Sequence, residues 1–173
     1  MATSPSVNNY WIGKGVVEIK ATGDADFREV GNVPEFEFTP TIDKLEHFSS
    51  MTGVKTKDKT VVLTKGYTLR MVLEEATKEN LALAILGEIA QNSAGADVIS
   101  IFSENAISCA VRFTGTNEVG EKFLWNLLKV DFIPGSSINL ISDEWGRYEL
   151  NGDGATVDGA FGTVEVLEET TDA

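Results

Sequence analysis

Residues 60–74 read Thr-Val-Val-Leu-Thr-Lys-Gly-Tyr-Thr-Leu-Arg-Met-Val-Leu-Glu, and they carry the strongest β signal in the chain. Apolar and polar side chains alternate along the second half of this segment. The apolar members on one face are Tyr67, Leu69, Met71 and Leu73. An alternation with a period of two is typical of a strand with one buried face. We therefore predict a strand here, with a β-bulge at Gly66.

A second strand signal lies upstream, where residues 33–40 read Val-Pro-Glu-Phe-Glu-Phe-Thr-Pro. Phe36 and Phe38 fall on one face of this strand, and Glu35 and Glu37 fall on the other. Proline has no N–H to donate to a sheet, so the two flanking prolines indicate an edge strand or an irregular strand end.

One helix is predicted among the strands. Leu81, Ile85 and Ile89 recur at helical spacing, which predicts a helix over about 78–87, with Thr77 as its N-cap. Gly87 either ends this helix or weakens it. Further strands are predicted over 10–21, 41–48, 97–103, 107–115, 122–132, 138–141, 145–150 and 163–167, with a turn over 151–154. Many short strands and one helix predict a mainly β fold, an antiparallel β-sandwich or barrel with one flanking α-helix.

The chain of 173 residues has the length of one domain. We predict a flexible arm over 1–9, a single domain over 10–167 and an acidic C-terminal tail over 168–173. Residues 48–59 show no apolar period, and we predict a long loop there. Loops of this length are usually functional or disordered.

The charge and composition exclude several classes of function. Fourteen basic residues and twenty-seven acidic residues give a net charge of −13. This charge argues against nucleic-acid binding and against binding to an anionic membrane. A single cysteine and a single histidine exclude a disulfide framework and multi-histidine metal sites. No apolar run is long enough to anchor the chain in a membrane, and the N-terminus lacks the pattern of a signal peptide, so we expect synthesis in a reducing cytoplasm.

The sequence contains no complete catalytic pattern. His47 would need a nucleophile such as Ser49 or Cys109 brought close to it by the fold, and a structural role is the simpler interpretation. Residues 151–155 resemble the start of a calcium loop, but Ala155 and Gly162 stand where oxygen ligands are required. We therefore predict no catalytic residue, no metal and no cofactor, and a protein that is not an enzyme.

Charge is unevenly distributed along the chain. Residues 55–70 contain five basic residues and one acidic residue, whereas residues 143–172 contain nine acidic residues and one basic residue. Two interpretations stay open. These segments are either two solvated faces or two complementary surfaces that meet between copies of the chain.

Residues 31–60 resemble a known family. The motif comprises residues 33–40 and then 45–58, which read Leu-Glu-His-Phe-Ser-Ser-Met-Thr-Gly-Val-Lys-Thr-Lys-Asp. It resembles the major tail tube proteins of long-tailed, siphovirus-type bacteriophages. The opening Gly-Lys-Gly-Val-Val at 13–17 and the later order of strand, helix and further strands are similar as well.

The resemblance implies a structural role in the virion tail, with assembly in the host cytoplasm. Tail tube subunits are β-sandwich-like, and six of them join into a ring whose inner wall is a β-barrel. The rings stack into a hollow tube, which holds a tape-measure protein and ends at tail-terminator and tail-tip proteins. DNA passes through the tube without tight binding during ejection.

The resemblance also implies that the segment around 48–59 reaches neighbouring subunits. The residues expected at this contact are His47, Phe48, Ser49, Ser50, Met51, Gly53, Lys55, Lys57, Asp58 and Lys59. Glu35 and Glu37 are candidate lumen-facing acids, since a wall that repels phosphate lets a duplex slide. Their face of the strand could equally be external.

Two alternatives stay open at this point. The first is the tube subunit of a contractile tailocin or secretion machine, which would share the fold. The second is a small-ligand-binding β-sandwich module or a hydrolase, because sandwiches host many functions. A deep pocket that holds His47 with an acid and a nucleophile would favour the second alternative.

Overall fold

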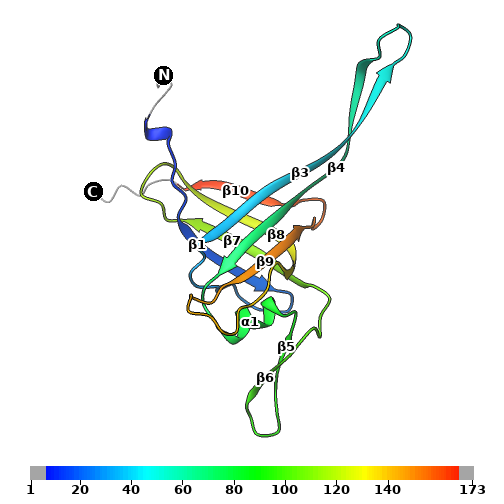
Figure 1. The fold of residues 1–173 in the computed structure, drawn as a ribbon. Coiled ribbons are helices and arrows are strands. Elements are labelled where there is room, and N and C mark those ends of the chain that lie inside the picture. The colour runs from blue at the N-terminus through cyan, green and yellow to red at the C-terminus, as the bar shows by residue number, and fades with distance from the viewer. Residues whose placement is uncertain (1–6, 168–173) are drawn as a thin grey trace.

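Antiparallel strands dominate the structure, a computed structural model that describes residues 7–167 (Figure 1). The elements in order are η1 (Val7–Asn9), β1 (Gly15–Ala21), β2 (Arg28–Glu29), β3 (Glu35–Ser49), β4 (Thr56–Leu73), α1 (Lys78–Ala84), β5 (Glu88–Gln91), β6 (Asp97–Ser100), β7 (Ile107–Gly115), β8 (Lys122–Pro134), β9 (Tyr148–Gly154) and β10 (Gly162–Leu167). The predicted mainly β fold with one helix is confirmed. Residues 1–6 of the expected arm and the expected tail over 168–173 lie outside the described residues.

One eight-stranded sheet forms the body of the molecule. Its order is β2–β1–β7–β8–β9–β4–β3, and β10 pairs with β8 off this path. β8 is long enough to pair with β10 along residues 122–127 and with β9 along residues 130–134, both on the side away from β7. Within the described residues this sheet stays open and does not close into a barrel.

The core lies where the two halves of the sheet fold over each other. The apolar face predicted for residues 67–73 is buried, with Tyr67, Leu69, Met71 and Leu73 each at most 4% exposed. Phe36 of β3 stacks on Phe113 of β7, with ring centroids 5.7 Å apart. Phe38 packs against Trp125 of β8 at 5.0 Å. The edge strand β3 therefore packs across the sheet, which gives the fold its sandwich-like character.

β3 and β4 form a much longer hairpin than predicted. The long loop expected over 48–59 is wrong, because β3 continues to Ser49, β4 begins at Thr56, and only residues 50–55 connect them. Backbone pairing needs no apolar period, so the polar sequence concealed these strands. Pro40 is accommodated because β3 is the edge strand.

Two register shifts distort this hairpin. The shift between Asp43 and Lys44 leaves Leu63 of β4 without a partner residue on β3. The shift between His47 and Phe48 leaves Asp58 of β4 without one in the same way. The bulge expected at Gly66 is wrong, since Gly66 pairs with Thr41 in the regular register.

The remaining differences concern short segments. Thr77 is the N-cap of α1 as predicted, but the helix ends at Ala84, and residues 88–91 form the strand β5 paired with β6. No strand forms over 138–141 within the described chain.

The turn expected over 151–154 is part of β9 instead. Gly152 packs against Phe132 and Gly154 against the Tyr67 ring, where a Cβ would collide, so these glycines allow close packing rather than a turn.

Asn80 ties α1 to the sheet. Its side chain is fully buried, donates to the carbonyls of Val30 and Glu75 at 2.9 and 3.0 Å, and accepts from Arg28 Nη1 at 2.9 Å.

We expect Asn80→Ala to lower the free energy of unfolding by about 2–3 kcal/mol, because it leaves buried carbonyls without donors. Urea denaturation measures this loss. Thr77→Ala, which removes only the cap, should cost about 1 kcal/mol. Equal losses for both variants would contradict the assigned role of Asn80.

Candidate assembly surfaces

His47 does not form a catalytic site with the nucleophiles considered from the sequence. It lies on β3 with 72% of its side chain exposed, and its Nδ1 is 2.6 Å from Asp58 Oδ1. Ser49 Oγ instead accepts from the backbone N–H of Met51. Cys109 lies in the core, where burial raises the pKa of its thiol to about 12. His47 lines neither the cavity beside α1 nor the pocket between Glu37, Arg70 and Asn151.

Among residues 7–167, no group of three His, Cys, Asp or Glu side chains is placed to hold a metal ion. Within that range, no helix has the length and apolar character needed to cross a membrane. The features that stand out are surfaces of the kind used in assembly.

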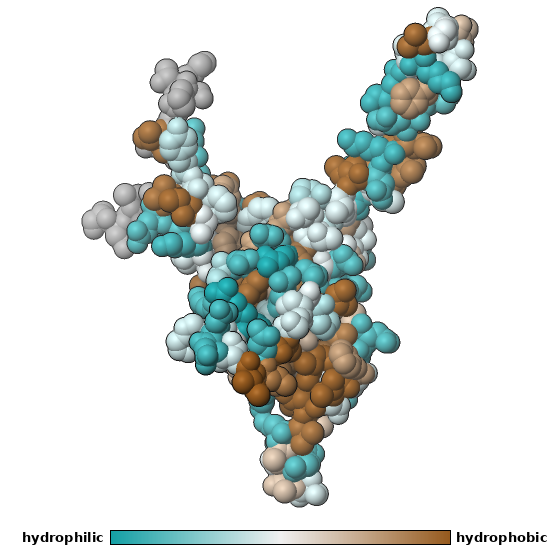
Figure 2. Space-filling model, viewed as in Figure 1, coloured by the Kyte–Doolittle hydropathy of each residue, from teal (hydrophilic) through white to brown (hydrophobic). Residues whose placement is uncertain are grey.

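The first surface is the distal hairpin, which we define as residues 44–63, beyond the paired Asp43 and Thr64. It extends away from the body (Figure 1), and brown and teal side chains interleave along it (Figure 2). Its exposed apolar residues are Leu45, Phe48, Met51, Val54, Val61, Val62 and Leu63. The pairing places Phe48 and Val62 on one face and Leu45 and Val61 on the other. Neither face is covered by another part of the described chain.

Polar contacts hold the distal hairpin in shape. Lys57 pairs with Glu46 at 2.8 Å, and at the base Thr64 Oγ1 donates to Asp43 at 2.6 Å. Lys55 and Lys59 form no ion pair among the described residues. The tip therefore presents positive charge together with Met51, which is 94% exposed.

The residues expected at inter-subunit contacts all fall on this hairpin. His47, Phe48 and Ser49 are on β3; Lys57, Asp58 and Lys59 are on β4; Ser50, Met51, Gly53 and Lys55 are in the connection. The structure brings them together on one exposed arm. Their contacts with other subunits stay a prediction.

The second surface is the polar face of the main sheet, opposite the core. Its carboxylates come from four strands, β1, β3, β8 and β9: Glu18, Glu35, Glu37, Asp131, Glu149 and Asp153. Arg70 lies among three of them, with Nη1 2.5 Å from Glu35 and 3.9 Å from Glu37, and Nη2 3.1 Å from Glu149. The hydrogen bond from Arg70 holds the pKa of Glu35 below its ordinary value. Arg112 binds both oxygens of Glu18, at 2.6 and 2.7 Å, and lowers the pKa of that carboxyl in the same way.

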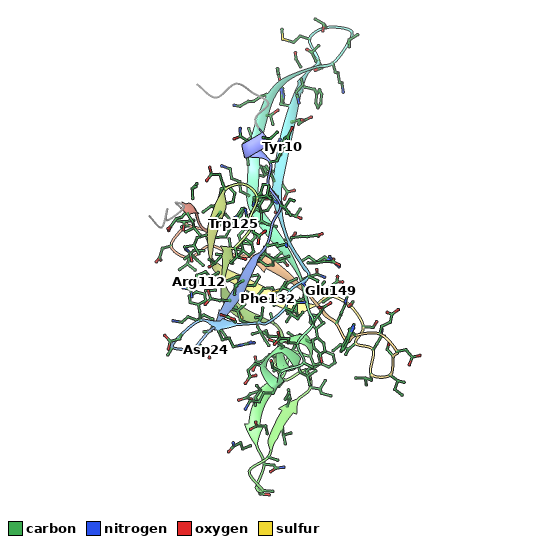
Figure 3. The ribbon with its side chains drawn as sticks, turned by 90° about the vertical axis from the view of Figure 1, so that its left-hand side faces the viewer. Tyr10, Asp24, Arg112, Trp125, Phe132 and Glu149 are labelled. Carbon is green, nitrogen blue, oxygen red and sulfur yellow. The ribbon has the colours of Figure 1, made fainter. Side chains whose placement is uncertain are left out.

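The third surface is a cavity of about 620 Å³ beside α1, at the end of the body away from the distal hairpin (Figure 1). Asp24, which contributes to its lining, lies at that end in Figure 3. The apolar floor includes Ile19, Leu83 and Ile107. The carboxylates in its lining are Asp24, Glu79, Glu88 and Glu104. Sequence reasoning missed this cavity because its walls come from segments that are far apart in the chain.

Within residues 7–167, Arg28 is the one basic residue that lines this cavity. Its guanidinium donates to Asn80 Oδ1, and burial lowers its pKa from the ordinary value. Among the described residues, Arg28 forms no ion pair with the four carboxylates of the lining. The cavity is therefore apolar at its floor and predominantly acidic around it.

The family described as "Protein of unknown function UCP028589" matches residues 10–98, just over half of the sequence. The chain belongs to this family. The part that matches the family includes the whole distal hairpin, α1 and much of the cavity lining.

No curated protein matches the chain. Among solved structures, it is similar to a chain in "Cryo-EM structure of the anti-feeding prophage (AFP) baseplate, 6-fold symmetrised", with 10% sequence identity and a TM-score of 0.49. The match covers 98% of this chain and 99% of that chain. At this level of likeness, the function has to be inferred from the surfaces of the chain itself.

Proposed function

We propose that this chain is a structural subunit of a phage-type tail, and that it joins copies of itself into rings of six that stack into a hollow tube. The observation that carries the proposal is the distal hairpin, with exposed apolar side chains on both faces. The resemblance of residues 31–60 to tail tube proteins supports the ring and the tube.

The physics of the hairpin favours an assembled state. A two-stranded hairpin that packs on nothing is marginally stable in water. Contiguous exposed apolar surface is typical of interaction sites. Packing against a second copy would stabilise the hairpin and remove this surface from water at the same time.

The open sheet favours a ring. β3 is an edge strand of 15 residues, and a long unpaired edge is a template for pairing with another chain. Pairing between unlike edges of neighbouring copies is a heterologous contact, which produces a closed ring if the rotation closes. Such a ring would continue the sheet around a central bore.

The polar face of the main sheet suits the wall of that bore. Carboxylates repel the phosphates of a duplex. Arg70 and Arg112 are engaged in salt bridges with Glu35 and Glu18, which reduces the ability of these two arginines to bind phosphates. In this proposal Glu35 and Glu37 face the lumen. The tube would lie in the virion tail, hold a tape-measure protein and end at terminator and tip proteins, and DNA would pass through it during ejection.

Negative-stain electron microscopy of the concentrated protein, with light scattering for mass, tests the proposal. Hollow rings or tubes with six-fold top views are the expected result. A monomer at every concentration and salt condition would contradict it, and a ring of another order would contradict the six-fold arrangement alone.

A further inference from the structure

We propose that the cavity beside α1 is the receptor for the distal hairpin tip of a second copy of this chain. This inference rests on the proposed function and deepens it, because it names the surface that meets the hairpin when rings stack. Three observations carry it: the charges, the apolar groups and the positions of the two surfaces.

The charges of the two surfaces are complementary. Lys55 and Lys59 lie at the hairpin end of the molecule and make no ion pair within the described residues. The cavity lining carries Glu79, Glu88 and Glu104, which are also without ion pairs in that part of the chain. Opposite charges on two surfaces guide the approach of partners and fix their register.

The apolar groups of the two surfaces also match. Met51 and Val54 are 94% and 75% exposed at the tip, and no described residue covers them. The cavity offers an apolar floor that includes Ile19 and Leu83 in a space of about 620 Å³. Methionine is flexible and adapts to irregular pockets. Inserting these side chains would remove apolar area from water on both partners.

The positions of the two surfaces require a second copy. The hairpin leaves one end of the body, and α1 with the cavity lies at the other end (Figure 1). Residues 44–49 extend the strand by roughly 20 Å beyond its base, directed away from the body. A tip that meets the opposite end of another copy makes a heterologous contact. Along the direction of the hairpin this contact does not form a closed ring, so each copy can bind a further copy in the same way. Repetition of the contact produces a stack.

Charge reversal on each surface tests the contact. The hairpin variant carries Lys55→Glu and Lys59→Glu and leaves Lys57, which pairs with Glu46 inside the hairpin, unchanged. The cavity variant carries Glu79→Lys, Glu88→Lys and Glu104→Lys. We expect each variant alone to raise the protein concentration needed for tubes at least about tenfold, because like charges then face each other. The chain that combines all five changes should recover to within about twofold of the wild type.

The matched control is Lys14→Glu and Lys122→Glu, which alters net charge by as much as the hairpin variant but lies outside both surfaces. It should assemble at the wild-type concentration, and circular dichroism establishes that all variants are folded. Unchanged tube formation by the cavity variant, or no recovery in the combined chain, would overturn the proposed contact. In both cases the wild type would still form tubes, whereas failure of the proposed function itself would leave the wild type monomeric.

Discussion

Removal of the distal hairpin is expected to abolish tube formation and to leave the body folded. In the proposed variant, an Asn-Gly turn replaces residues 44–63 and connects Asp43 to Thr64. These two residues are paired opposite each other, and Asn-Gly is the preferred two-residue hairpin turn. The deletion removes Met51, Phe48 and the lysines that we propose to bind the next copy.

The body should tolerate this truncation because the core contacts lie elsewhere. Phe36 and Phe38 still pack on Phe113 and Trp125, and Arg70 still bridges Glu35 and Glu149. Surface changes away from such features usually cost less than about 0.5 kcal/mol, and we expect a loss in the free energy of unfolding of at most about 1 kcal/mol. Electron microscopy measures the tubes and urea denaturation measures the stability.

The truncation separates assembly from folding. Tubes formed by the truncated chain would contradict a role for the hairpin in assembly. A second variant, in which Asn-Gly replaces only residues 50–55 between the paired Ser49 and Thr56, removes the tip and keeps both strands. It should retain rings and lose stacks, since the tip is the part assigned to the cavity of the next copy.

The largest effect on stability is expected at Phe132. Its side chain is fully buried in the core, and its strand β8 pairs with β7 and β9 on its two sides. Phe132→Ala should lower the free energy of unfolding by about 3–5 kcal/mol, through lost burial and the cavity left behind. A loss of that size is a large part of the 5–15 kcal/mol that is ordinary for a domain. Chemical denaturation measures it.

The matched control is the next residue on the same strand. Ile133 points to the opposite face and is 44% exposed, so Ile133→Ala should cost about 1 kcal/mol or less. Equal costs at the two positions would mean that β8 does not have one buried face and one exposed face. A register slip of one residue would exchange the two results, because it would move every side chain to the other face.

Part of this structure could be predicted from the sequence. The alternation at Tyr67–Leu73 predicted a buried strand face because that strand has the core on one side and solvent on the other. Thr77 was identifiable as the N-cap because capping is a local contact, made here to the N–H of Asn80. The prolines at 34 and 40 indicated an edge strand or an irregular strand end, and in the structure β3 is an edge strand.

Other elements could not be predicted because their cause is not local. Residues 48–59 were predicted as a loop, but they include the end of β3 and the start of β4, and neither face of the hairpin there packs on the core, so no apolar period marks these residues as strands. Gly152 and Gly154 were interpreted as turn residues, but they lie in a strand because Phe132 and Tyr67 need the space that a Cβ would fill. Ile89 fits the helical spacing, yet it pairs with Ile99 in a hairpin.

The sequence by itself determined the mainly β class, the core face of β4 and the start of α1, and it limited β3 to an edge strand or an irregular strand end. These properties follow from periodicity, proline chemistry and capping, which act over a few residues. Only the tertiary structure decided that the lysine-rich segment projects as a hairpin and that an acidic cavity lies at the opposite end. The cavity unites β1, α1 and the segment before β7, which are separated by many residues and meet only when the sheet pairs.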